Sequence, residues 1–124
     1  MTLVLDAGAL IAVERGDRDA VAVIQAARLD GRAVVIPAAV VAQTWRDGPR
    51  QALLARLLSA TDVEVEILTH EVARATGQLC GATHTSDIVD ASVVIVARRH
   101  NATILSSGRG DLIRLDPTLA IVDC

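Results

Sequence analysis

Short hydrophobic runs, each bounded by polar or turn-forming residues, recur along the chain and predict five β-strands. Residues 3–5 and 33–36 are entirely aliphatic, which is typical of strands buried on both faces of a sheet. Residues 103–107 and 119–122 contain shorter apolar runs and predict two further strands. In residues 63–68 aliphatic side chains alternate with two glutamates, which predicts an edge strand whose charges discourage pairing with another chain.

Between these runs, apolar residues recur at the spacing of one helix face, and capping residues stand at the segment ends. The predicted helices span residues 7–14, 18–30, 37–45, 50–59, 69–82 and 86–100, with one further turn at 112–115. The helix that begins at Pro37 carries an apolar stripe that ends at Trp45, so we expect Trp45 to lie in the core. The members of this stripe are Ala38, Val41, Ala42 and Trp45. Four leucines of the next helix are expected to face inward, namely Leu53, Leu54, Leu57 and Leu58.

The segment 86–100 contains four consecutive β-branched residues, which by themselves favour a strand. Its ends favour a helix. Ser86 is a good N-cap, Asp87 would lie in the first turn, and three basic residues occupy the last turn, all with the polarity that the helix dipole prefers. We therefore predict a helix here.

Strands and helices alternate along the whole sequence, and this order predicts a three-layer α/β/α sandwich with a mainly parallel sheet of about five strands. No linker, repeat or low-complexity segment interrupts residues 1–124, so we expect a single domain. In such sheets the functional crevice lies beyond the carboxyl ends of the strands.

Composition narrows the possible functions. Hydrophobic residues make up 52% of the chain and the net charge is only -3, which excludes intrinsic disorder. All 12 basic residues are arginine, so mechanisms that need a lysine are excluded. No segment approaches the roughly 18 uninterrupted apolar residues of a membrane span, and no basic start precedes the first apolar run. We expect a cytoplasmic protein without a membrane anchor, with Cys80 and Cys124 reduced.

Acidic residues from three regions are predicted to meet at the carboxyl edge of the sheet. Asp6 ends the first strand, Asp87 and Asp90 lie one turn apart near a helix start, and Asp111 follows the fourth strand. Two carboxylates about 4 Å apart repel by about 4 kcal/mol at an effective dielectric constant near 20. A cluster of this kind persists when a cation binds or a group is protonated. Because the set offers only oxygen ligands, the expected ion is Mg²⁺ or Mn²⁺.

Three stretches resemble those of the PIN-domain ribonucleases, in particular the VapC-type toxins of toxin–antitoxin pairs. They are "VLDAGALIA" with Asp6, "DIVDASVVIVARRH" with Asp90, and "ILSSGRGDL" after the fourth strand. The resemblance covers the whole chain. It implies cleavage of RNA by metal-activated water, inhibition by a partner antitoxin, and a homodimer, with Asp6 and Asp90 as catalytic residues and metal ligands.

Two positions depart from that family pattern. Gln43 stands where members typically place a glutamate, and Gly108 stands where they commonly carry an aspartate, so that Asp111 comes three residues late. An amide oxygen brings no charge and is no general base. In this interpretation Asp111 and Asp87 support the metal site, and Gln43 and Ser106 are supporting residues. Arg46 is a candidate contact for an RNA phosphate.

Other interpretations remain open. Asp6 and Asp111 are also suitable helix caps, and Asp87 is also explained as an acid that complements a helix dipole. Because Gln43 and Gly108 replace two acids of the family pattern, the alternative function is a weakened or inactive module of the same fold that binds an antitoxin or RNA. A phospho-accepting receiver domain is disfavoured, because that class relies on a lysine near its site and this chain has none.

Overall fold

The computed structural model describes all 124 residues and contains one five-stranded sheet in which every neighbouring pair of strands is parallel. The strand order is β3-β2-β1-β4-β5, with β1 at the centre. The strands are β1 (Thr2–Leu5), β2 (Ala33–Pro37), β3 (Val63–Glu66), β4 (Thr103–Ser106) and β5 (Ala120–Asp123). The predicted α/β class and parallel sheet are confirmed.

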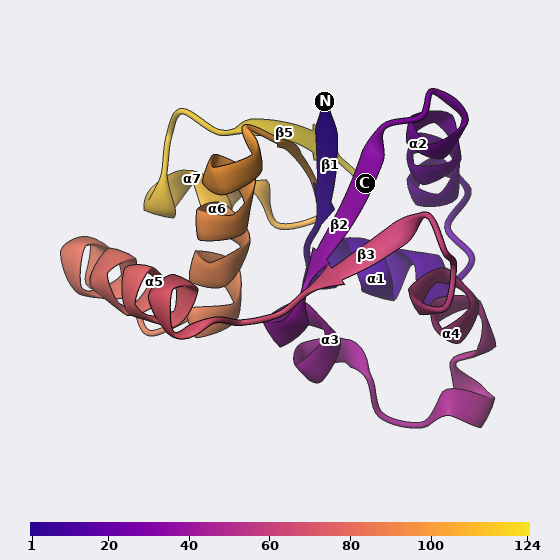
Figure 1. Cartoon of the computed structure of the whole chain (residues 1–124), viewed down its shortest axis with the longest axis horizontal. Helices are drawn as coiled ribbons and strands as arrows, with labels where there is room; N and C mark the ends of the chain where they lie inside the picture. The colour runs from indigo at the N-terminus through magenta and orange to yellow at the C-terminus, as the bar shows by residue number, and fades with distance from the viewer.

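Helices cover both faces of the sheet (Figure 1). On one side α1, α2 and α4 contact one another, and on the other side α5, α6 and α7 pack together. The short α3 lies beyond the carboxyl ends of the strands and contacts both α1 and α6. The helices are α1 (Ala7–Glu14), α2 (Arg18–Leu29), α3 (Ala38–Thr44), the 3₁₀ turn η1 (Gly48–Arg50), α4 (Ala52–Leu58), α5 (His70–Thr83), α6 (Ile88–His100) and α7 (Arg109–Leu115).

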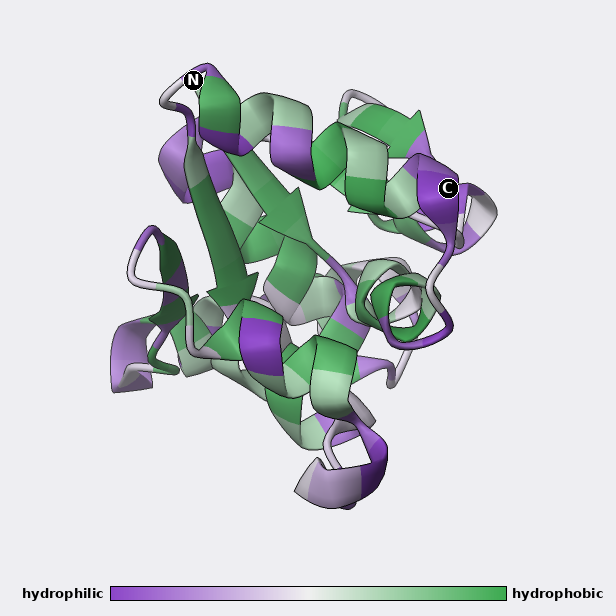
Figure 2. Ribbon diagram, turned by 90° about the vertical axis from the view of Figure 1, so that its right-hand side faces the viewer, coloured by the Kyte–Doolittle hydropathy of each residue, from purple (hydrophilic) through white to green (hydrophobic).

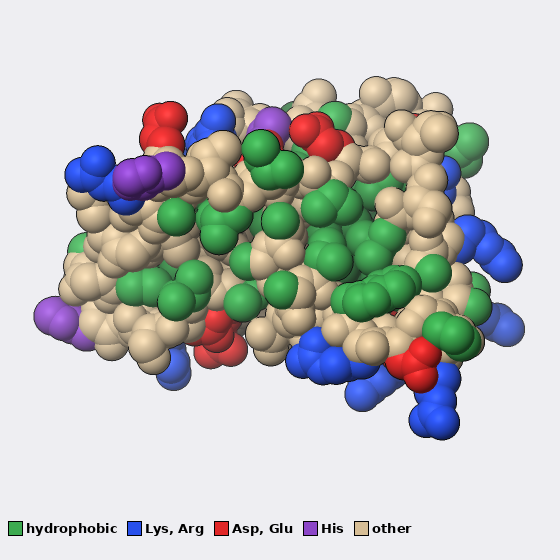
Figure 3. Space-filling model, turned by 60° about the horizontal axis from the view of Figure 1, so that its bottom comes forward, with side chains coloured by type: hydrophobic (Ala, Val, Ile, Leu, Met, Phe, Trp, Pro, Cys, Tyr) green, Lys and Arg blue, Asp and Glu red, His purple; other side chains and the backbone are tan.

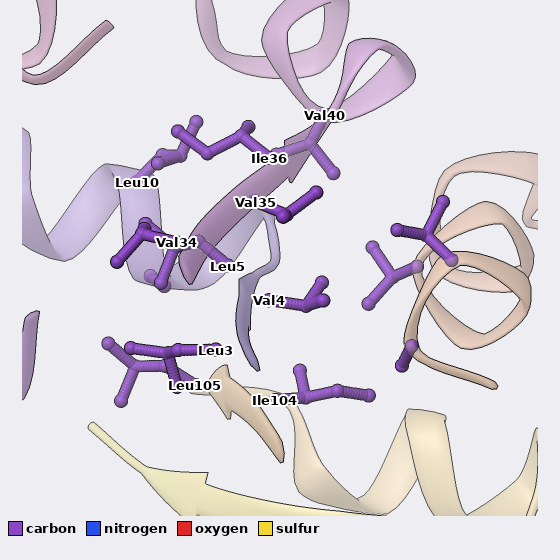
Figure 4. Packing of buried hydrophobic residues seen from close by; sticks show 14 of the residues in the cluster. Leu3, Val4, Leu5, Leu10, Val34, Val35, Ile36, Val40, Ile104 and Leu105 are labelled. Carbon is purple, nitrogen blue, oxygen red and sulfur yellow. The ribbon is translucent and has the colours of Figure 1, made fainter. Parts of the chain in front are cut away.

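The core is almost purely aliphatic and is centred on the three inner strands. Side chains alternate across the sheet: on β1, Leu3 and Leu5 point toward α1, whereas Val4 points toward α6 (Figure 4). All three are at most 1% exposed. Figure 2 shows the same pattern as hydrophobic strands at the centre and hydrophilic residues on the outer turns. Burial of both faces explains why these strands have no polar alternation in the sequence.

The helix α6 confirms the prediction for its ambiguous segment. Seven consecutive residues, Ala91–Ala97, are buried, because α6 is covered by α5 and α7 as well as by the sheet. The predicted start was one residue early. Asp87, not Ser86, is the N-cap, and its Oδ1 accepts a hydrogen bond of 3.0 Å from the backbone N–H of Asp90. The carboxylate at this position therefore takes the capping role that the serine was expected to fill.

The expected core position of Trp45 was wrong. Trp45 lies just beyond the end of α3 and is 38% exposed, while Val40 and Thr44 form the buried face of that helix. The helix ends early because the buried amide of Gln51 donates a 2.8 Å hydrogen bond to the carbonyl of Thr44, and the chain then continues in an extended conformation. The loop that follows carries Trp45 outside the core.

Three further expectations need correction. Leu53 on α4 is 44% exposed, because α4 packs through Leu54 and Leu57. On β3 only Val63 is buried among the valines, since this short strand lies at the sheet edge and α4 contacts it only in part. Asp111 lies within a helix and not in a loop, because α7 begins directly after β4 and is two turns long.

No single helix is long and apolar enough to cross a bilayer. Only α5 and α6 taken together satisfy length and composition, and that pair is bent by 114° at its break.

The beginning of α1 approaches the turn between β4 and α7 so closely that only glycine fits at position 8. A Cβ atom there would lie 1.9 Å from Ser107 Oγ and 3.2 Å from the Ser107 backbone nitrogen. By contrast, nothing lies within 4 Å of the Cβ position of Gly77 on α5. These two helical glycines are a matched pair for testing the approach.

Gly8→Ala should lower the free energy of unfolding by about 1 to 3 kcal/mol, because the added methyl group overpacks the contact between α1 and Ser107. Gly77→Ala should raise it by up to about 1 kcal/mol through helix propensity alone. Urea unfolding followed by circular dichroism measures both. If both substitutions stabilise the protein equally, α1 does not pack tightly against Ser107.

Candidate active site at the carboxyl edge of the sheet

Asp6 connects the ends of the two strands at the middle of the sheet. It follows β1 directly and caps α1, with Oδ1 accepting a 2.8 Å hydrogen bond from the backbone N–H of Ala9. Its Oδ2 accepts a short hydrogen bond from the hydroxyl of Ser106, the last residue of β4. Asp6 is only 4% exposed. The carboxylate is therefore held in one orientation by groups from α1 and β4.

Ser106 also organises the turn that follows it. The Ser106 hydroxyl donates to Asp6 and accepts a 2.8 Å hydrogen bond from the backbone N–H of Gly108, the residue before α7. Ser106 is fully buried, so both partners are needed to satisfy its hydroxyl. One side chain thus couples the position of Asp6 to the start of the helix that carries Asp111.

Burial raises the pKa of Asp6 above its ordinary value. Removal from water disfavours the charged carboxylate, and this effect exceeds the opposing effect of the hydrogen bonds from Ser106 and from the backbone of Ala9 and Gly8. A cation near Asp6 would reverse this shift, since it would stabilise the ionised form.

Asp90 lies in the first turn of α6 and is only partly buried. Its pKa is raised to about 6, chiefly by desolvation and then by the negative charges of Asp87, Asp6 and Asp111. These causes show that acids from three separate chain regions act on one another at this edge. The grouping predicted from the sequence is therefore present as an electrostatic cluster, which we call the acid cluster (Asp6, Asp87, Asp90 and Asp111).

No arginine or histidine neutralises the acid cluster. The five ion pairs of the chain all involve other acids, namely Asp62, Asp47, Asp116, Glu66 and Asp123. At neutral pH the carboxylates therefore repel one another without compensation from the chain itself. This arrangement favours an external cation.

The donor chemistry of the acid cluster fits a hard divalent cation, but its geometry is open. The cluster offers carboxylate oxygens only, the ligand type that Mg²⁺ and Mn²⁺ prefer. No three acidic, histidine or cysteine side chains stand close enough together to enclose an ion. Mg²⁺ usually keeps several waters and binds proteins through one or two carboxylates, so an open site of this kind suits it.

Gln43, predicted as a supporting residue, and Arg46, predicted as a contact for an RNA phosphate, form no hydrogen bond with the acid cluster. Gln43 lies exposed on α3, and its amide forms no hydrogen bond within the chain. The guanidinium of Arg46 donates through Nη1 to the carbonyls of Ala42 (3.1 Å) and Trp45 (2.7 Å). Arg46 thus satisfies free carbonyls at the end of α3. Its Nε and Nη2 groups make no bond within the chain and remain available.

Sequence reasoning missed two residues beside Asp6. Gly8 permits the close approach of α1 to Ser107, and Cys124 is attached to β4 through a 3.0 Å hydrogen bond from its backbone N–H to the carbonyl of Ser106. Burial, together with the charges of Asp6, Asp17 and Asp123, raises the pKa of the Cys124 thiol to about 11. The thiol therefore stays protonated. No local pattern signals a contact between the two ends of the chain.

Comparison with known proteins agrees with this architecture. The family model of the PIN domain matches residues 3–116. No curated protein matches the sequence.

Three solved structures resemble the whole chain. VapBC2 from Rickettsia felis, bound to a DNA fragment from its promoter, matches with a TM-score of 0.74 and 15% identity over 100% of this chain and 99% of that chain. FitAB bound to the IR36 DNA fragment matches with a TM-score of 0.66 and 16% identity over 98% and 94%. FitAcB from Neisseria gonorrhoeae matches with a TM-score of 0.63 and 18% identity over 96% and 95%. At these identities the likeness establishes a shared fold.

Asp90→Asn should stabilise the protein in the absence of divalent ions, and the gain should depend on pH. The pKa of Asp90 is about 6 in the folded chain against an ordinary value of 3.8, so the folded state binds the extra proton between these values and the wild type loses stability as pH rises from 3.8 through 6. Allowing for the solvent exposure of Asp90, we expect a gain of about 1 kcal/mol at pH above about 7. The gain should vanish below about pH 3, where Asp90 is protonated in both the folded and the unfolded wild type.

Urea unfolding in EDTA at a series of pH values measures this difference. A difference between Asp90→Asn and wild type that stays constant across the series would contradict the electrostatic origin of the effect.

Proposed function

The chain belongs to the PIN domain family, and from this premise we propose that it is a metal-dependent endoribonuclease that acts as the toxin of a toxin–antitoxin pair in the cytoplasm. The observation that carries the proposal is the acid cluster, which gathers four carboxylates from three chain regions with no counter-charge of its own. RNA as the substrate and the homodimeric state follow from the resemblance to VapC-type toxins and stay predictions.

Asp6 and Asp90 are the residues that would hold the metal ion, and Asp87 and Asp111 would strengthen the local negative potential. When bound there, Mg²⁺ or Mn²⁺ would supply Lewis-acid stabilisation of the negative charge on a phosphodiester. Asp6 is suited to this role because two hydrogen bonds fix its orientation before any ligand arrives.

Asp90 is suited to move a proton. In the chain without a bound ion its pKa is about 6, so its carboxylate accepts a proton more readily than an ordinary aspartate would. A divalent ion on Asp90 would lower that pKa, so the carboxylate serves either as a metal ligand or as a proton acceptor. Asp90 is also partly exposed, so water has access to it.

The alternative function is a module that binds an antitoxin or RNA without cleaving it. The open geometry of the acid cluster supports this alternative, as does Gln43, which is neutral and has no contact with the acids. The two functions differ in one outcome. Expression of a nuclease toxin halts bacterial growth and Asp6→Ala restores it, whereas a folded binding module leaves growth unchanged.

The purified chain should cleave single-stranded RNA in Mg²⁺ or Mn²⁺ and lose this activity in EDTA. Asp6→Asn and Asp90→Asn should each reduce the cleavage rate by roughly 100-fold or more, the usual cost of removing a catalytic acid or base. Activity should also fall at acidic pH, because protonation of Asp90 removes a metal ligand. Gel assays with end-labelled RNA, and with DNA of the same sequence, measure rate and substrate class.

Asp30→Asn is the matched control, because Asp30 is an exposed acid at the end of α2, outside the acid cluster. Calorimetric titration with Mg²⁺ supplies a second measurement that does not depend on activity. Identical Mg²⁺ binding by wild type and Asp90→Asn would contradict the assignment of Asp90 as a metal ligand.

A groove on the helical layer formed by α1, α2 and α4 suits an antitoxin. The groove has a volume of about 540 Å³ and is lined mostly by apolar side chains, among them Val21, Ile24 and the exposed Leu53. Arg56 adds a positive charge at its border. Pockets of this size and character bind apolar segments. The solved relatives are themselves toxin–antitoxin assemblies, so the partner for this groove is the apolar face of an antitoxin segment.

Leu53→Asp should weaken binding of the cognate antitoxin by at least about 10-fold, because a charge is placed in an apolar interface. Leu29→Asp is the matched control: Leu29 is 86% exposed on α2 and does not line the groove. Calorimetry with the purified antitoxin measures both. Equal affinities of the two variants would show that the groove is not the docking site.

A further inference from the structure

Trp45 is the only aromatic residue of the chain, and the fold leaves it outside an otherwise aliphatic core. It is 38% exposed although it is the largest apolar side chain available to the core. The indole N–H donates no hydrogen bond within the chain. Neither packing nor hydrogen bonding within the chain therefore accounts for an exposed indole at this position.

The loop that carries Trp45 is held in one conformation by a buried glutamine. Gln51 is only 5% exposed, and its Oε1 accepts hydrogen bonds from the backbone N–H groups of Arg46 (2.8 Å) and Asp47 (2.9 Å). Its Nε2 donates to the carbonyl of Thr44 (2.8 Å). These three bonds surround Trp45 on both sides in the sequence, so the position of its backbone is well determined.

The indole ring itself rests against Gly48. A Cβ atom at Gly48 would lie 3.1 Å from Trp45 Cζ2 and 3.4 Å from Cη2, so the ring is seated where any side chain would displace it. One part of the ring is thus supported by the backbone while the remainder faces solvent. A rigid, half-exposed aromatic surface is what stacking of a nucleic acid base requires.

The surroundings of Trp45 are basic, in contrast to the chain as a whole. Residues 43–56 contain three arginines and one acid, whereas the net charge of the chain is -3. The side chain of Arg50 is 88% exposed and only loosely paired with Asp47 at 3.6 Å. Arg46 keeps its Nε and Nη2 groups free. Arginines beside an exposed ring supply contacts for the phosphates that flank a stacked base.

This loop lies on the same edge of the sheet as the acid cluster. It follows α3, which contacts α1 and α6, the two helices that begin at Asp6 and Asp87. Figure 3 shows the face at this edge, where hydrophobic side chains gather across the middle and arginines lie around the periphery, most of them at the right and lower right. An RNA strand that enters the site can therefore extend over the α3 to η1 loop.

We infer that Trp45 is a stacking platform for an unpaired base of the RNA substrate, with Arg46 and Arg50 as contacts for the adjacent phosphates. The inference rests on the proposed ribonuclease function and assigns its substrate as single-stranded RNA. Double-stranded RNA does not expose its base faces to such a ring, so the platform discriminates against it.

Because Trp45 is the only tryptophan and the chain has no tyrosine, its fluorescence reports this one site. Wild type in EDTA, where no metal-dependent cleavage occurs, is titrated with a non-pairing RNA of about 12 nucleotides, within the length that single-strand binding surfaces cover. Saturable quenching is expected with the single strand and not with the same RNA annealed to its complement. Trp45→Leu should weaken binding of the labelled single strand roughly 10-fold or more, and Trp45→Phe should recover most of the affinity.

Leu29→Ala is the control for loss of an exposed apolar side chain elsewhere, and unfolding curves verify that each variant is folded. Unchanged fluorescence in saturating RNA, or wild-type RNA affinity of Trp45→Leu, would overturn the inference. So would a change in wild-type fluorescence that depends on protein concentration alone, together with sedimentation that shows a dimer for the wild type and a monomer for Trp45→Leu, since the ring would then be covered by a second copy of the chain. Quenching by RNA without any cleavage in Mg²⁺ would refute the ribonuclease proposal but support Trp45 as a stacking platform. Cleavage without quenching would support the ribonuclease proposal and refute the role of Trp45.

Discussion

The buried hydrogen bond between Ser106 and Asp6 is the contact on which the carboxyl edge of the sheet depends. It joins the ends of β1 and β4, and through the backbone N–H of Gly108 it also fixes the start of α7. The same carboxylate caps α1. Because one charged group serves two strands and two helix starts, the position of the acid cluster is coupled to the packing of the whole central layer. The glycine at position 8 is required so that α1 can begin this close to Ser107.

The acid cluster is electrostatically unfavourable for the folded chain alone. The negative charges of Asp87, Asp6 and Asp111 add to the raised pKa of Asp90, while every arginine ion pair is formed elsewhere. Unfavourable charge of this kind is typical of sites that bind a ligand, since the ligand supplies the missing compensation. Asp87 is also the N-cap of α6, so the same residue both starts that helix and adds to the negative potential of the acid cluster.

Much of the site was accessible from the sequence because the topology is simple. When strands and helices alternate in a parallel sheet, residues that directly follow strands meet at one edge, which is why Asp6 and Asp111 were expected there. Asp90 follows α5 and not a strand, and its expected place beside them rests on the predicted polarity of α6. Trp45 was misplaced for an equally physical reason. A helical stripe predicts which residues share a face, but it does not predict where a helix stops, and here Gln51 ends α3 through a contact seven residues away. The place of Cys124 was missed because two of the acids near its thiol, Asp6 and Asp17, belong to the other end of the chain.

Local rules thus account for the class of fold, the order of the elements and the strand ends that carry acids, because periodicity, capping and the handedness of parallel connections act over short segments. The glycine contact at position 8 and the raised pKa of Asp90 depend on residues that are distant in sequence and adjacent in space, and the exposed ring of Trp45 depends on the contact of Gln51 beyond the end of its helix. The burial of a side chain and the charges around it depend on the folded surroundings, so they are defined only after β1, β4 and α6 have come together.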